Sequence, residues 1–101
     1  MSFTVVRYKT KPDRGDENQV LVEKVFAELD AAQPDGLTYT TFRLADGVSF
    51  VHVAEVTTAD GANPLTAMPA FGDFLREVAD RCDEPPAASP ATVVGRYRAP
   101  V

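Results

Sequence analysis

The sequence has 101 residues, of which 45% are hydrophobic and 25% charged, so we expect one globular domain over residues 1–101 with its own core. A net charge of −5 without any basic run argues against nucleic acid as a partner, because phosphate binding needs clustered Lys and Arg. No apolar stretch approaches the roughly 20 residues of a membrane span, and the N-terminus lacks a signal pattern, so we expect no membrane association and a cytoplasmic location.

The first two elements are a strand and a helix. β-branched and aromatic residues predict a strand over 3–10. Asp16 is the expected N-cap of the helix, with Gln19 as its capping-box partner. Apolar residues at helical spacing continue to Ala32, and the segment 34–36 (Pro-Asp-Gly) ends the helix.

A β-hairpin is predicted next, with strands over 37–44 and 49–57. Asp46-Gly47 favours a two-residue turn in which both residues have positive φ, and this register places His52 opposite Thr41. One face of the hairpin then carries Tyr39, Thr41, Arg43, Phe50, His52, Ala54 and Val56. The other face carries Thr38, Thr40, Phe42, Leu44, Val51, Val53 and Glu55. Both faces hold apolar residues, so both require a cover.

The last third begins with a short helix, which Asn63-Pro64 can open. A second helix is predicted from Pro69, with an apolar stripe that reaches Cys82. The proline-rich segment 85–90 reads as an extended connector, and a final strand is expected over 92–98.

The order β-α-β-β-α-β predicts an α+β, ferredoxin-like split β-α-β fold, with one antiparallel sheet and both helices on one face. Two helices cover only one side of that sheet. A second copy of the chain is the simplest cover for the other side, so we expect a homodimer.

The pattern resembles the dimeric α/β-barrel superfamily and, within it, the antibiotic-biosynthesis-monooxygenase-like (ABM-like) domains. The resemblance spans nearly the whole chain and lies in the segments 5–12, 34–37, 50–56 and 68–75. It implies a pocket between each sheet and its own helices. Some such proteins oxidise aromatic, polyketide-type substrates with molecular oxygen and without metal or flavin, and others degrade haem.

The resemblance also aligns functional positions. In the quinone-forming monooxygenases, an Asn on the third strand falls at His52, a Trp at Val56, a Tyr at Ala62 and an Arg at Arg76. One position is thus kept, one carries another polar residue, and two aromatic residues are replaced. The haem-degrading branch fits less well, because this chain has no Trp and no His on the second helix, so we expect no haem and no other cofactor.

His52 is the candidate catalytic residue. It is the single histidine, and imidazole accepts protons near neutral pH, so it could take a proton from a phenolic or carbonyl ligand. The alternative is a structural histidine bonded to a neighbour such as Thr41. With one His and one Cys, Cys82, the sequence offers no metal-ligand set, and Cys82 is expected to be buried.

Tyr39, Arg43, Phe50 and Arg76 are the candidate ligand-binding residues. Arg43 on this partly apolar face could instead pair with a carboxylate across a dimer interface, and Arg76 could be a solvated side chain beside Glu77 or Asp80. The sequence leaves two functions open. One is a cofactor-independent monooxygenase for a small aromatic or polyketide-type molecule. The other is a non-catalytic, ligand-binding or stress-associated dimer.

Overall fold

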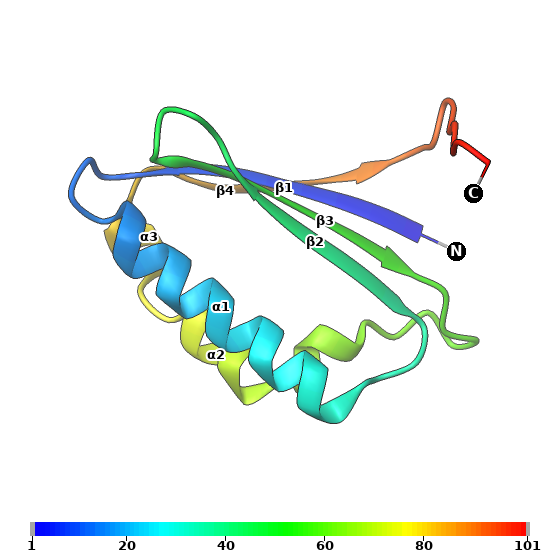
Figure 1. The fold of residues 1–101 in the computed structure, drawn as a ribbon. Coiled ribbons are helices and arrows are strands. Elements are labelled where there is room, and N and C mark those ends of the chain that lie inside the picture. Colours follow the sequence, from blue (N-terminus) through cyan, green and yellow to red (C-terminus); the bar gives the residue numbers. More distant parts are fainter. Residues whose placement is uncertain (1, 101) are drawn as a thin grey trace.

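The computed structural model describes residues 2–100 and shows one four-stranded antiparallel sheet with the helices on one of its sides (Figure 1). The strands lie in the order β2-β3-β1-β4. In chain order the elements are β1 (Ser2–Thr10), α1 (Gly15–Ala32), β2 (Leu37–Arg43), β3 (Ser49–Val56), the 3-10 helix η1 (Pro64–Ala67), α2 (Pro69–Leu75), α3 (Val78–Arg81) and β4 (Cys82–Ala91). The predicted α+β architecture is therefore confirmed. Within residues 2–100, no helix is long and apolar enough to cross a membrane.

The hairpin register is as predicted, with Thr41 opposite His52 and Arg43 opposite Phe50. Burial alternates along β3, so Phe50, His52 and every second residue after them face the helices. The central strand β1 pairs with β3 and places Val6 opposite His52.

The turn between β2 and β3 differs from the predicted two-residue type. Gly47 N–H donates to the Leu44 carbonyl at 3.0 Å, and Leu44 N–H donates to the Ser49 carbonyl at 2.8 Å, so residues 45–48 form the loop. Gly47 has a φ of 77°, whereas Asp46 does not adopt a positive φ. The Asp46 carboxylate instead accepts from the backbone of Val48 and Ser49, which fixes the wider loop without changing the register.

The N-cap prediction for α1 was also wrong. The helix begins at Gly15 with Arg14 in the N-cap position and no side-chain cap. Asp16 lies inside the first turn, where its negative charge suits the helix dipole, and pairs with Arg43 at 3.0 Å. Arg14 binds Glu17 through two hydrogen bonds of 2.7 and 2.8 Å.

The second half of the chain required two corrections. The helix predicted to reach Cys82 ends at Leu75, because Arg76 is extended (ψ 124°). Glu77 is left-handed (φ 61°), and α3 starts after it. The expected connector 85–90 belongs to β4, while the expected strand over 92–98 has no regular secondary structure. β4 is an edge strand that pairs only with β1, and an edge tolerates proline because one side of the strand needs no donors.

The core lies between the sheet and the helices, where Tyr8 stacks on Phe50 with ring centres 5.5 Å apart. Complete burial of a side chain such as Phe50 or Val25 contributes roughly 1.5–3 kcal/mol. The core cluster consists of Tyr8, Val22, Val25, Phe50, Leu65, Ala70, Phe74 and Cys82. Among residues 2–100, no helix lies over the opposite side of the sheet (Figure 1).

Candidate functional site

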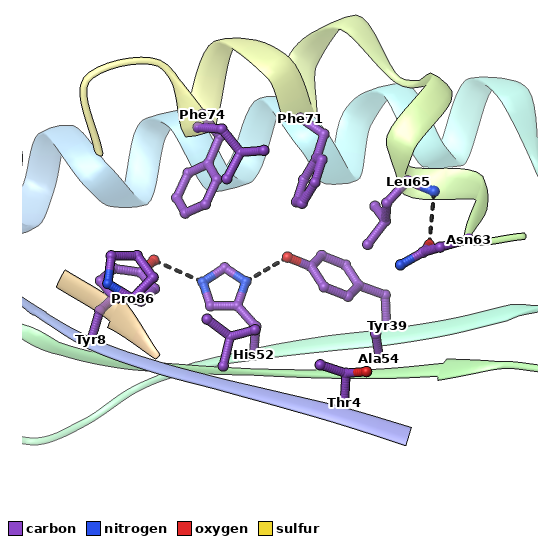
Figure 2. Close-up of a pocket in the computed structure, with 12 residues that line it drawn as sticks. Thr4, Tyr8, Tyr39, His52, Ala54, Asn63, Leu65, Phe71, Phe74 and Pro86 are labelled. Carbon is purple, nitrogen blue, oxygen red and sulfur yellow. Dashed lines mark hydrogen bonds between the residues drawn. The ribbon is translucent and has the colours of Figure 1, made fainter. Parts of the chain in front are cut away.

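A cavity of about 140 Å³ lies between the helix-facing side of the sheet and the segment η1–α2 (Figure 2). The residues that line it are Thr4, Val6, Tyr8, Tyr39, His52, Ala54, Asn63, Leu65, Phe71, Phe74, Leu75 and Pro86. The polar side chains of His52 and the two tyrosines stand on the sheet, and Phe71 and Phe74 face them from α2. One wall can thus form hydrogen bonds while the opposite wall offers aromatic surface.

His52 is 4% exposed and stands between two tyrosine hydroxyls. Its Nε2 is 2.7 Å from the Tyr8 Oη, and its Nδ1 is 2.5 Å from the Tyr39 Oη and 3.1 Å from the Thr41 Oγ1. The Thr41 contact is the one expected for a structural histidine. Both ring nitrogens therefore have partners within the protein.

Burial determines the protonation states here. It lowers the pKa of His52 to about 4, so the imidazole is neutral at pH 7. Burial also raises the pKa of Tyr39 to about 12, against the opposing effect of a hydrogen bond with Thr41. It raises the pKa of Tyr8 well above its usual range, although the hydrogen bond from Asn18 acts in the other direction. His52, Tyr8 and Tyr39 are all uncharged near neutral pH.

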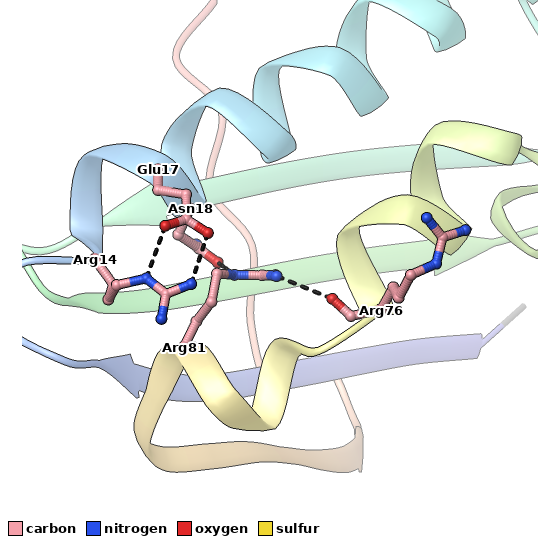
Figure 3. Close-up of polar contacts among 5 residues, drawn as sticks. All are labelled: Arg14, Glu17, Asn18, Arg76 and Arg81. Carbon is pink, nitrogen blue, oxygen red and sulfur yellow. Dashed lines mark hydrogen bonds and ion pairs between the residues drawn. The ribbon is translucent and has the colours of Figure 1, made fainter.

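The buried hydrogen bonds extend from Tyr8 to Asn18 and Arg81. The Asn18 side-chain amide donates to the Tyr8 Oη at 2.8 Å. Arg81 Nε donates to the Asn18 Oδ1 at 3.3 Å (Figure 3). Arg81 is 2% exposed and also donates to the carbonyls of Phe74 and Arg76, at 2.6 and 3.1 Å. Its guanidinium lies 5.4 Å from the centre of the Phe74 ring. None of the ion pairs recorded within residues 2–100 involves Arg81.

Two of the predicted site residues, His52 and Tyr39, line the cavity. Phe50 packs behind Tyr8 and is not part of the cavity wall. Arg43 lies beside the hairpin loop, where it donates to the Gly47 carbonyl at 2.7 and 2.9 Å. The Arg76 side chain is 72% exposed and pairs with Asp73 at 3.1 Å, and Arg76 is not among the residues that line the cavity.

The sequence analysis did not single out Tyr8, Asn18 or Arg81. Tyr8 lies two residues after Val6 and so on the same face of β1, and the alternation of the strand could have identified it. Asn18 lies four residues before Val22, at the N-terminal end of the apolar stripe of α1, and a polar residue on that face is a signal for a buried polar contact. Arg81 gave no such signal, because the break at Glu77 changes which residues of this segment face inward.

Cys82, the neighbour of Arg81, is buried as expected, and burial raises the pKa of its thiol. Within residues 2–100, no three His, Cys, Asp or Glu side chains gather closely enough to hold a metal ion. The chemistry that this site supports is hydrogen bonding to a polar group of a mainly apolar ligand.

No family model matches the sequence, and no curated protein matches it. Solved structures do share its fold. Rv0793 from Mycobacterium tuberculosis has 15% identity and a TM-score of 0.74, with 96% of this chain and 98% of that one covered. A structure named as an antibiotic biosynthesis monooxygenase has 15% identity and a TM-score of 0.74, with 94% of this chain and all of that one covered.

The third structure is an N63A mutant of SnoaB from Streptomyces nogalater, named as a cofactor-independent oxygenase. It has 18% identity and a TM-score of 0.68, and the alignment covers 94% of both chains. At these identities the likeness concerns the fold, and the alignments cover almost the whole of each chain. This chain therefore shares the fold of Rv0793, SnoaB and a protein named as an antibiotic biosynthesis monooxygenase.

Proposed function

We propose that the chain is a cofactor-independent monooxygenase for a small aromatic molecule whose carbonyl or phenol oxygen binds at Tyr39. The observation that supports this proposal best is the Tyr39–His52 pair on the wall of an otherwise largely apolar cavity. SnoaB, which shares the fold, is named as an oxygenase of this type.

The size of the cavity limits the ligand. An apolar cavity of roughly 150 Å³ in another protein takes up a benzene molecule. The cavity of about 140 Å³ beside His52 therefore suits a single ring with a short substituent. Phe71 and Phe74, whose ring centres lie 6.2 Å apart, offer the aromatic surface for that ring.

The proposed reaction converts an activated CH₂ group and O₂ into a carbonyl group and water. The substrate loses a proton to solvent water to become an enolate or phenolate, which transfers electrons to O₂ as a new C–O bond forms. The O–O bond of the resulting peroxide breaks as the second hydrogen leaves the same carbon as a proton. All four electrons that reduce O₂ come from the substrate, so no cofactor is required.

Stabilisation of the substrate anion is the role we propose for the protein. A hydroxyl that donates to the anionic oxygen inside a dry cavity acts more strongly than one in water. Tyr39 would make this contact from the cavity wall, with His52 Nδ1 hydrogen-bonded to its oxygen.

A pH profile separates this role of His52 from direct proton acceptance. If His52 took the proton itself, kcat/KM would fall as the pH drops through its pKa near 4. If Tyr39 binds the substrate anion, kcat/KM would instead follow the ionisation of the substrate at higher pH.

Oxygen consumption tests the function directly. Single-ring hydroquinones and ketones with an activated CH₂ group should be oxidised by the wild-type protein, and Tyr39→Phe should lower the rate roughly 10²- to 10³-fold, as loss of one donor to a developing anion does elsewhere. His52→Ala should also be slower. Equal rates for the wild type and both variants, with melting temperatures confirming folded proteins, would rule out the proposal.

A non-catalytic ligand-binding protein is the second candidate. The observation that favours it is the replacement of two aromatic residues of the resembling monooxygenases by Val56, which is buried, and Ala62, which is exposed on a loop. In this case, aromatic ligands should raise the melting temperature without any oxygen uptake.

We also propose that a second copy of the chain covers the open side of the sheet. Phe42 is 52% exposed there, and Val5, Val51 and Val53 are only partly buried. A continuous apolar surface of this kind on a single chain usually marks an interface.

A further inference from the structure

The buried hydrogen bonds behind the cavity form a chain in which each side chain donates to the next. This chain begins at Arg81. A guanidinium group only donates hydrogen bonds. The Nε–H of Arg81 therefore requires an acceptor, and the atom that faces it at 3.3 Å is the carbonyl oxygen of Asn18. The reverse orientation of the Asn18 amide would bring two donors face to face.

The orientation of the Asn18 amide determines that Asn18 donates to Tyr8. With its oxygen towards Arg81, its amide nitrogen must donate to the Tyr8 Oη, 2.8 Å away. The Tyr8 oxygen is thus an acceptor, and its own proton needs another partner. Within residues 2–100, the remaining recorded partner of this hydroxyl is His52 Nε2, at 2.7 Å.

The orientation of Tyr8 decides which nitrogen of His52 carries the hydrogen. A neutral imidazole has one N–H and one acceptor nitrogen. Because Nε2 accepts from Tyr8, the hydrogen belongs on Nδ1, where it donates to the Tyr39 Oη at 2.5 Å. Tyr39 in turn lines the cavity, so its own proton can be donated to a ligand there.

We infer that Arg81 and Asn18 are positioning residues: through Tyr8 they hold His52 as the Nδ1–H tautomer and so present the hydroxyl of Tyr39 to the cavity as a donor. The ligands that this site selects are aromatic molecules with an acceptor oxygen, either a carbonyl or a phenolate. This ligand class rests on the proposed function, whereas the tautomer of His52 does not.

The tautomer can be measured without any ligand. His52 is the only histidine, so protein labelled with ¹⁵N-histidine gives one pair of ring signals. At pH 8 the wild-type signals should show a protonated Nδ1 and an unprotonated Nε2. A wild-type spectrum with the hydrogen on Nε2 would overturn the inference, whatever the variants do.

Asn18→Asp tests the direction of the chain with almost no change in shape. The new carboxylate can pair with Arg81 but cannot donate, so the Tyr8 hydroxyl should turn towards it and accept from His52 Nε2 instead. The hydrogen should therefore move from Nδ1 to Nε2. Thr41→Val is the matched control, since it removes a partner of Nδ1 outside the chain and should leave the tautomer unchanged. A folded Asn18→Asp protein that kept the wild-type tautomer would contradict the roles of Asn18 and Arg81.

Two molecules of nearly equal shape test the ligand class. Acetophenone carries an acceptor oxygen where α-methylstyrene carries a CH₂ group. One hydrogen bond from Tyr39 should make acetophenone bind the wild type about 3- to 10-fold more tightly by calorimetry, and Tyr39→Phe should abolish this preference. Equal affinities, or binding of neither molecule, would overturn the ligand class. If acetophenone is preferred and the tautomer is as inferred, absence of oxygen uptake refutes the monooxygenase reaction alone.

Discussion

His52 shows how the surroundings of a residue change what its type suggests. A histidine on a strand first indicates a group that gains and loses protons near neutral pH. In the folded chain, both ring nitrogens are hydrogen-bonded and the side chain is almost fully buried. The contact with Thr41 could be predicted from the hairpin register, but the contacts with Tyr8 and Tyr39 depend on how β1 lies beside β3 and which way long side chains turn.

The low pKa of His52 makes the stability of the fold depend on pH. Between pH 6.5 and about 4 the unfolded chain binds a proton at this residue and the folded chain does not, so stability falls as the pH falls through this range. The loss attributable to His52 should reach roughly 3 kcal/mol by pH 4.

Urea unfolding at pH 7 and pH 4 measures this loss. The variant His52→Gln cannot titrate at this position, yet it keeps the carboxylates that also respond to acid. The wild type should therefore lose roughly 3 kcal/mol more than the variant over the same range. Equal losses in the two proteins would show that His52 is already protonated or not desolvated.

At the scale of the elements, the sequence predicted β1, α1, β2, β3, η1 and the start of α2 in order, and misjudged the segment after Leu75. The hairpin strands and α1 have a regular spacing of apolar residues. Their observed bounds differ from the predicted ones by small shifts at the ends. β4 could not be recognised because Pro85, Pro86 and Pro90 normally argue against a strand, and only the sheet order reveals that it is an edge. The helix break at Glu77 left no Gly or Pro signal either.

The start of α1 packs closely against the hairpin loop, and Gly15 allows this contact. A Cβ atom at Gly15 would meet the Gly47 carbonyl oxygen well inside contact distance and the Arg43 Nη2 at 2.6 Å. Gly15→Ala should therefore destabilise the fold by roughly 1–3 kcal/mol, because the helix or the loop must shift.

Gly72 in α2 provides the matched control, since nothing lies within 4 Å of a Cβ placed there. Gly72→Ala should raise stability by up to about 1 kcal/mol, because alanine is the better helix former. Thermal unfolding of both variants measures the contrast. Two variants with the same effect would mean that the close approach at Gly15 is not retained in solution.

For the whole molecule, the two sides of the sheet have different roles. The helix-facing side holds the core and the cavity, and the other side presents partly exposed apolar residues. The sequence already indicated this imbalance, because both faces of the hairpin carry apolar residues while two helices cover only one. The position of the cavity could not be predicted in the same way, since it depends on where η1 and α2 lie over the sheet.

Sedimentation equilibrium tests the proposed homodimer. The wild type should behave as two chains of 10.9 kDa each, and Val53→Glu should give single chains, because a charge buried at the centre of the interface lacks a partner in both copies. Ala27→Glu, on the exposed side of α1, makes the same change in charge and should leave the wild-type mass unaltered. A wild-type protein that stays monomeric at all concentrations would exclude the homodimer.

The hydrogen-bond chain from Arg81 to Tyr39 draws its five side chains from α3, α1, β1, β3 and β2. Detachment of any one of these elements would break the chain, so the cavity wall exists only when the whole domain is folded. The backbone amides around the cavity should consequently exchange with solvent deuterium through global unfolding rather than through local opening. A bound ligand would then slow exchange across the entire domain, and the set of amides that it slows would show how far the unfolding is cooperative.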